Sequence, residues 1–215
     1  MTSLPTARNA ALLASTALAG LTSMAVVAAP TSAAVPAAVV HTQRDTVADV
    51  WLQGETPDLW SEHGARRNVD LTASRVRHAP RMITTTGWFT DLVRTEDRTS
   101  TVFWILTSAG RTYRVQHTAG PSRRSGQVFF KQYVDGRLHG RSCPGLTNQV
   151  SYADDLMRVV IPRPCLGRPA WVRFHGVAVA FDEESGARYS DAMMDSGPDN
   201  QLYSPRIVRD DPPRG

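Results

Sequence analysis

Short apolar segments separated by turn residues run along most of this 215-residue chain. In several of them apolar and polar residues alternate, which places one face of a strand in a core and the other toward solvent. In 111–117, for example, Tyr113 and Val115 lie opposite Arg114. No segment before residue 183 shows sustained helical periodicity. The pattern predicts an all-β chain, an antiparallel β-sandwich of the jelly-roll kind with about eight or nine strands.

Turn signals indicate how neighbouring strands connect. Asp135-Gly136 is typical of a two-residue hairpin, and Ser108-Ala109-Gly110 of a three-residue hairpin loop. The run VFWIL at 102–106 is apolar on both faces, so we expect it in a central strand. The expected strands lie at 45–52, 69–78, 81–92, 100–107, 111–118, 126–134, 136–143, 156–162 and 170–181.

The N-terminus carries the features of a secretory signal peptide. Arg8 precedes an uncharged apolar run at 10–29, and small residues follow at 32–34. We therefore expect residues 1–34 to direct export by the general secretory route, because a lone arginine rather than an arginine pair precedes the run. The exported chain would be secreted or associated with the cell envelope, without a membrane segment after cleavage. An uncleaved membrane anchor is the alternative, since about 20 apolar residues can span a bilayer.

Composition indicates where the domain begins and ends and which classes of partner it can bind. Residues 35–44 are predicted to form a linker, 45–182 the sandwich, and 183–215 a polar extension ending in a disordered tail. Without residues 1–34 the chain holds 23 basic and 20 acidic residues, a net charge of +3. This charge is too small to indicate a nucleic-acid partner. Lys131 is the only lysine, so nearly every positive charge is an arginine, which favours carboxylate and phosphate contacts.

The two cysteines, Cys143 and Cys165, are the only ones in the chain. An even number of cysteines in an exported protein predicts a disulfide. Closing a loop of this length contributes roughly 3 kcal/mol in the chain-entropy model. A catalytic thiol near His175 is the alternative, but such a thiol would have to stay reduced outside the cell. The cysteines are therefore expected to form a structural staple.

No catalytic centre, cofactor or metal site is predicted. The chain lacks the GxSxG elbow, the phosphate-binding loop, the dinucleotide fingerprint and the zinc spacings HxH and HExxH. A Ser-His-Asp set can assemble from distant residues, which leaves an extracellular hydrolase open. Among the histidines, His175 is expected to be packed, while His117 and His139 are expected to face solvent near strand ends.

Acidic residues form a modest pattern, some in the N-terminal strands and the others in and after the turn that follows the last strong strand. Calcium takes six to eight oxygen ligands from loops of this kind, but no EF-hand spacing is present. We interpret these acids as solvated loop residues and expect no metal there. They are Asp45, Asp49, Asp70, Asp182, Glu183, Glu184, Asp191 and Asp195.

Aromatic and basic residues supply the candidates for ligand binding. Five tryptophans on a sandwich favour carbohydrate binding, because sugar rings stack on flat aromatic faces. Trp104 and Trp171 lie in apolar runs and are expected in the core, whereas Trp60 is the best exposed candidate. A basic face on one hairpin is the second candidate, and a merely solvated sheet face is its alternative. That face would hold Arg123, Arg124, Arg137 and Arg141, with Lys131 and His139 beside them.

The segment IPRPCLGRPAWVR at 161–173 resembles a VPRxCLGxPxWVR motif of small exported proteins of actinobacteria, most of them uncharacterised. The resemblance extends over about 45–181 and includes DTVADVW at 45–51 and FWILTSAGRTYRV at 103–115. It implies a sandwich similar in architecture to DOMON-like and carbohydrate-binding modules. TSAGRT at 107–112 stands where the group has an Asp-rich turn, so no metal site is carried over. The group implies no activity for this chain.

These features predict an exported, non-enzymatic binding or cell-envelope module. Its expected partner is a polysaccharide or another extracellular or cell-envelope component. One alternative is an extracellular hydrolase without a recognisable motif. Another is a secreted protease inhibitor whose binding loop, near Cys143-Pro144-Gly145, is held by the disulfide.

Overall fold

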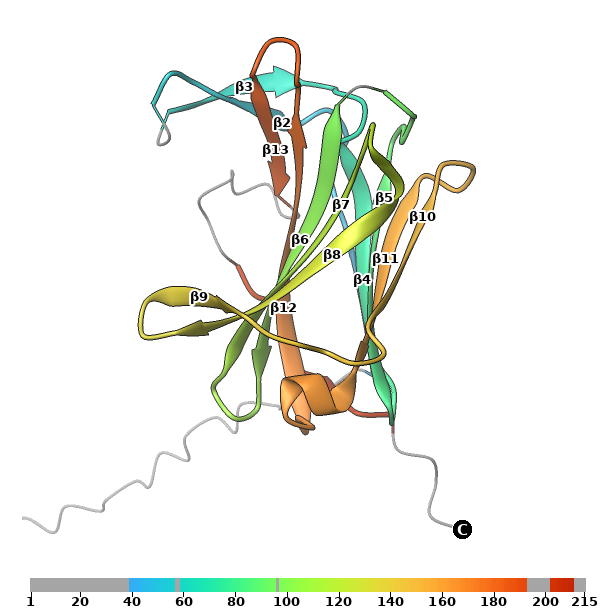
Figure 1. Cartoon of the computed structure of the whole chain (residues 1–215), viewed down its shortest axis with the longest axis vertical. Coiled ribbons are helices and arrows are strands. Elements are labelled where there is room, and N and C mark those ends of the chain that lie inside the picture. Colours follow the sequence, from blue (N-terminus) through green and yellow to red (C-terminus); the bar gives the residue numbers. More distant parts are fainter. Residues whose placement is uncertain (1–38, 57–58, 96, 193–201, 211–215) are drawn as a thin grey trace, which may run out of the picture. The chain divides into compact units, whose positions relative to one another are not determined.

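The computed structural model describes residues 39–56, 59–95, 97–192 and 202–210 (Figure 1). Regular structure in this part of the chain consists of fourteen β-strands and one short 3-10 helix, η1 (Arg163–Leu166). All strand pairs are antiparallel and they form two sheets, which confirms the predicted all-β sandwich. The predicted signal peptide lies outside the described residues.

The smaller sheet has five strands, with β1 at one edge and β10 at the other. Its central strand, β5 (Met82–Phe89), pairs with β4 on one side and β11 on the other. Its order is β1 (Val40–Arg44), β4 (Leu71–His78), β5, β11 (Leu156–Pro162) and β10 (Thr147–Ser151).

The larger sheet has nine strands, with β6 (Arg98–Thr107) between β12 and β7. This placement confirms that the doubly apolar run at 102–106 is central. Figure 1 shows β6, β7 and β8 as long strands side by side, with β9 folded back along the far end of β8 as a hairpin. The order is β3 (Trp60–Gly64), β2 (Val50–Gln53), β13 (Arg188–Ala192), β12 (Trp171–Phe181), β6, β7 (Thr112–Gly120), β8 (Arg123–Val134) and β9 (Arg137–Gly140), with β14 (Ile207–Val208) paired to β12.

The core lies between the two sheets. Val76 and Ile161 of the smaller sheet and Phe103 and Phe174 of the larger one belong to one buried cluster. Phe174 has no exposed surface, and its ring centroid is 6.1 Å from that of Phe103. Because successive side chains of a strand alternate between its faces, the residues next to these core positions point to the outer face of the larger sheet. The core therefore occupies one face of the larger sheet, and the other face points away from it.

Both predicted hairpins are confirmed. Gly110, between β6 and β7, has φ +72°. Asp135 and Gly136, between β8 and β9, have φ 48° and 78°. Two successive positive φ angles are the requirement of a type I′ turn, which Asp-Gly satisfies.

Three strands lie outside the predicted limits of the sandwich, which corrects those limits. Strand β1 falls in the predicted linker and pairs with β4 along its whole length. Strands β13 and β14 fall in the predicted polar extension. Tyr189 of β13 and Ile207 of β14 are buried. The segment RYSDA has only one large apolar residue, so its composition concealed a strand that backbone pairing with β12 and β2 holds in place.

The disulfide between Cys143 and Cys165 is present, with its Cα atoms 5.4 Å apart. Cys143 follows β9 and Cys165 lies in η1, which Gly167 terminates at φ 75°. Both cysteines pack against the core cluster together with Leu146. The bridge therefore fastens the loop after β9 to the segment that leads into β12, and neither sulfur is a free thiol.

His117 is fully buried on the inner face of β7, which corrects the prediction that it faces solvent. It shares that face with Tyr113 and Val115. The Asn148 amide donates a hydrogen bond to Nε2 of His117, at 3.1 Å, and another to the Ser125 carbonyl, at 2.7 Å. Burial lowers the pKa of His117 to about 4. The ring is therefore neutral, and a protonated ring would set an N–H against the Asn148 N–H.

Acidification is expected to destabilise the fold through His117. Its folded pKa, about 4, lies below the ordinary value of 6.5, so the unfolded chain binds the proton more tightly and the contribution present above pH 6.5 is lost as the pH falls toward 4. The loss between neutral pH and about pH 5 amounts to about 2 kcal/mol. Urea unfolding at the two pH values measures it, with His117→Gln as the non-titrating comparison. An identical pH dependence in the two proteins would contradict this assignment.

Candidate ligand-binding groove and acidic cluster

A groove of about 480 Å³ opens on the outer face of the larger sheet. Its lining residues on β6, β7, β8 and β12 alternate with the buried core positions of the same strands. The strands therefore hold the groove side chains on a rigid base that the packed core supports. The lining residues that contribute charge are Arg98, Arg114, Arg123, Glu183 and Arg188.

A ladder of polar side chains crosses the groove between β6 and β7. The Ser100 and Thr118 hydroxyl oxygens are 2.8 Å apart. The Gln116 amide donates to both, at 3.4 and 3.3 Å. Its carbonyl oxygen accepts a hydrogen bond from Nη2 of Arg114 at 2.9 Å. The ladder thus holds Arg114 in a defined orientation through one of its nitrogens.

The groove carries net positive charge. Four arginines line it and, among the described lining residues, Glu183 is the one acid. Glu183 lies 3.9 Å from Nε of Arg98, in a partly exposed pair. Burial lowers the pKa of the Arg114 guanidinium, and the charge of Arg188 lowers that pKa further. An anion in the groove would relieve this repulsion between the arginines.

Two phenylalanines add apolar surface to the groove. Phe129 of β8 is 40% exposed, and Phe181 at the end of β12 is half-buried. The Arg98 guanidinium lies 5.0 Å from the centroid of the Phe181 ring. Charged, hydroxyl-bearing and aromatic groups therefore face the same open space.

Tryptophans lie on strand faces beside arginines. Trp104 and Trp171, expected in the core, are only half-buried. The Arg114 guanidinium is 5.7 Å from the Trp104 ring, and that of Arg206 is 4.6 Å from the Trp171 ring. Alternation explains the difference, since each tryptophan neighbours an inward-facing apolar residue and so points outward.

The predicted binding residues are not brought together as one site. Arg123 lines the groove, and Trp60, half-buried on β3, lies 5.8 Å from the guanidinium of Arg188. Arg124 donates a hydrogen bond to the Thr95 carbonyl at 2.5 Å. Arg137 on β9 and Arg141 after it are exposed and lie outside the groove lining. The hairpin therefore supplies one arginine to the groove.

Three groove arginines were not among the predicted binding residues. Arg114 had a signal, because its alternation with Tyr113 and Val115 placed it on a polar face. Arg98 is the first residue of β6, and no feature of the sequence indicated that it would line a binding site. Arg188 lies in the segment that was predicted to be an extension, where a lone arginine carries no indication of its neighbours in space.

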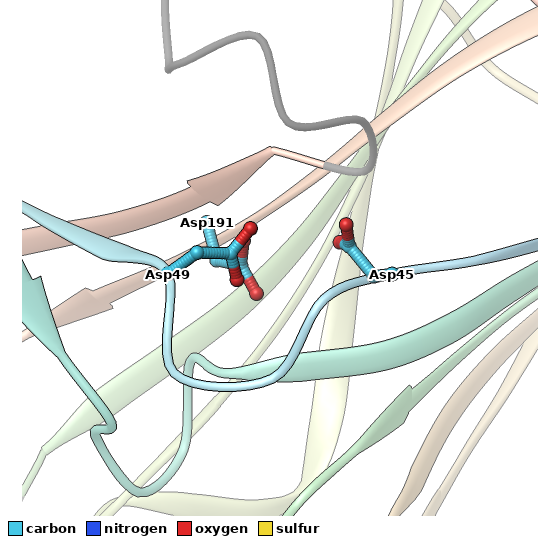
Figure 2. Close-up of side chains that lie close together, drawn as sticks. All are labelled: Asp45, Asp49 and Asp191. Carbon is cyan, nitrogen blue, oxygen red and sulfur yellow. The ribbon is translucent and has the colours of Figure 1, made fainter.

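Four aspartates meet where the two sheets join at β1, β2 and β13. Asp45 and Asp49 lie in the connection from β1 to β2, and Asp191 lies on β13. A carboxylate oxygen of each lies within 4.8 Å of the others. Figure 2 shows the Asp49 and Asp191 carboxylates close together, with that of Asp45 facing them from the other end of the connection. Asp70, just before β4, is near enough for its charge to act on Asp191.

Two of these acids are buried, which corrects their interpretation as solvated loop residues. Asp191 is 0% and Asp70 2% exposed. Asp70 accepts hydrogen bonds from the Ala48 N–H, at 3.1 and 3.3 Å, and from Thr90. Burial raises its pKa, although those bonds lower it. Glu183 and Glu184 are exposed, as expected, and Asp195 lies outside the described residues.

Asp191 has an unusual environment for a carboxylate. Its Oδ2 accepts a hydrogen bond from the Leu71 N–H at 2.5 Å. Its Oδ1 is buried and has no hydrogen-bond partner among the described residues. Burial raises the pKa of Asp191 to about 9, and the charges of Asp45, Asp49 and Asp70 contribute in the same direction. The Asp191 carboxyl group therefore keeps its proton at neutral pH unless a positive charge lies beside it.

Comparisons with known proteins give no indication of what the groove or the acidic cluster binds. In the described part of the chain no helix is both long enough and apolar enough to cross a bilayer. No protein-family model, curated protein or solved structure matches the chain.

Proposed function

We propose that this protein is a non-enzymatic extracellular binding module whose groove holds an acidic polysaccharide. The observation that carries the proposal is the presence of four arginines, a polar ladder and two phenylalanines in one groove. Guanidinium groups bind carboxylates through paired, charge-assisted hydrogen bonds. The ladder matches sugar hydroxyls, and phenyl rings match the apolar faces of sugar rings. A polymer of uronic acids presents all three complementary groups.

The charge of the groove supports binding rather than hydrolysis. Most glycoside hydrolases use two carboxyl groups on either side of the scissile bond. Among the described lining residues only Glu183 bears a carboxylate, and Arg98 lies beside it. The acidic cluster cannot serve as the second carboxyl group, because Asp191 is fully buried and the aspartates do not line the groove.

The distribution of charge supports a polysaccharide over a nucleic acid. Proteins that bind nucleic acid through phosphates present many cationic side chains over a broad surface. Here 24 basic residues face 20 acidic ones in the whole chain, and the excess is concentrated in the groove. Action outside the cell is supported by the predicted signal peptide and by the disulfide, since disulfides persist in oxidising compartments.

Neutralising groove arginines is expected to weaken binding. Arg123→Gln and Arg188→Gln should each lower the affinity for polygalacturonate about tenfold or more, because each removes a charge-assisted hydrogen bond. Phe129→Ala should weaken it through the lost ring contact. Affinity electrophoresis and isothermal titration calorimetry measure these changes. Arg137→Gln is the matched control, because Arg137 is an exposed arginine on β9 outside the groove.

Two results would count against the proposal. An equal loss in Arg137→Gln and Arg188→Gln would indicate attraction by overall charge, without a site. Tighter binding to single- or double-stranded DNA than to polygalacturonate at the same ionic strength would assign the groove to nucleic acid instead.

A further inference from the structure

The acidic cluster has the donor set of a hard cation. Asp45, Asp49 and Asp191 each offer a carboxylate oxygen, and these oxygens lie within 4.8 Å of one another. Calcium–oxygen bonds are about 2.3–2.6 Å long, so two oxygens on one calcium ion lie at most about 5 Å apart. A single ion placed between them can therefore lie within about 2.8 Å of one oxygen of each carboxylate, close to the length of a calcium–oxygen bond.

A second observation points to a missing partner of Asp191. Asp191 is fully buried, yet its Oδ1 has no hydrogen-bond partner in the described part of the chain. The described ion pairs do not include Asp191. Buried carboxylates are normally paired or bound to a metal, because an isolated buried charge is strongly unfavourable. The orphaned oxygen lies on the side of the carboxylate not held by the Leu71 N–H.

We propose that Asp45, Asp49 and Asp191 bind a calcium ion that joins the connection between β1 and β2 to β13. Calcium fits better than other common cations. Zinc prefers nitrogen and sulfur ligands, and the cluster offers neither. Magnesium keeps several waters and usually takes one or two carboxylates, whereas calcium accepts many carboxylate oxygens in flexible geometry.

The ion would join the two sheets at one end of the sandwich. Asp45 directly follows β1 of the smaller sheet, and Asp49 directly precedes β2 of the larger one. Asp191 belongs to β13, which pairs with β2, and also accepts the N–H of Leu71, the first residue of β4. Calcium thus offsets the repulsion between the carboxylates and fixes the crossover from one sheet to the other.

Calcium binding is tested on the purified full chain after treatment with EDTA and removal of the chelator. Equilibrium dialysis with radioactive calcium is expected to show one bound ion per chain. At calcium concentrations about 100-fold above the dissociation constant, the melting temperature should rise by roughly 5–10 °C. Magnesium at the same concentration should produce a smaller rise.

Variants separate a metal site from simple screening of charge. Asp191→Asn and Asp49→Asn should each abolish the calcium-induced rise in melting temperature. Without calcium, Asp191→Asn should melt at the same temperature as the wild type or higher, because the variant lacks a buried carboxyl group that the neighbouring aspartates repel when it is charged. Glu62→Gln, which alters an exposed acid on β3, should respond to calcium like the wild type.

The proposal is overturned if dialysis finds no bound calcium in the wild-type chain. A calcium response that persists unchanged in both Asp191→Asn and Asp49→Asn would place the ion elsewhere and also overturn it. An equal response to magnesium and calcium would reject the assignment to calcium. None of these results depends on polysaccharide binding, so the two proposals stand or fall separately.

Discussion

Replacing Gly126 with alanine is expected to lower the free energy of unfolding by about 3 kcal/mol or more. Two effects add. Gly126 has φ +83°, where an alanine costs about 1–2 kcal/mol. An added Cβ would also collide with Nε2 of His117 and lie 3.0 Å from Cγ2 of Val150. His117 is fully buried and held by Asn148, so it cannot move aside without losing that bond.

Gly136→Ala separates the two effects. Gly136 has φ +78°, and nothing lies within 4 Å of an added Cβ. This variant should lose only about 1 kcal/mol or slightly more, from backbone strain. Chemical denaturation of both variants measures the difference. Equal losses would show that His117 does not pack against Gly126 as described.

Removing the disulfide is the second change with a large expected effect. The double variant Cys143→Ser, Cys165→Ser should lose about 3 kcal/mol, because the reduced unfolded chain gains the entropy of an open loop. The two cysteines are 22 residues apart in sequence. Reduction of the wild type by dithiothreitol should reproduce the loss, and the reductant should leave the double variant unchanged.

The state of the sulfurs is measured separately by mass spectrometry after alkylation. The native protein should take up no alkyl groups until it is reduced, and then two. If the native protein is alkylated at both cysteines, or if the double variant unfolds at the same denaturant concentration as the wild type, the staple is not formed or does not stabilise the fold.

Alternation and turn chemistry made much of the sandwich predictable. The run at 102–106, apolar on both faces, lies in β6 in the middle of the larger sheet, as predicted. Asp135-Gly136 determined a hairpin through its positive φ angles. Only two cysteines were present, so one pairing was possible. These signals are local in the sequence, and the tertiary packing of the fold is consistent with the local structure that each of them favours.

The edge and terminal strands were not predictable in the same way. Strand β13 is a polar segment with one large apolar residue, Tyr189, and its pairing with β12 and β2 joins residues far apart in sequence. Strand β1 lies at an edge of the smaller sheet, where it needs little apolar surface. Such strands are held by backbone hydrogen bonds to partners far away in the sequence, and these bonds require no periodic pattern of apolar residues.

The candidate sites depend on the same distant pairings. Arg98 and Arg188 share the groove only because β6 and β13 both pair with β12. Asp49 and Asp191 meet only because β2 pairs with β13. An aspartate in a polar segment predicts exposure, whereas Asp191 is buried by the sheet packed over it. Residue type indicated the chemistry, and strand order decided which residues act together.

The central claim, that the groove binds an acidic polysaccharide, is tested most directly by titrating the wild-type protein with polygalacturonate and with neutral dextran in a calorimeter. Saturable binding of polygalacturonate is expected, weaker at higher ionic strength because arginine–carboxylate contacts are screened, with no binding of dextran. Failure to bind any uronic-acid polymer at low ionic strength, or equal affinity for polygalacturonate and dextran, would contradict the claim.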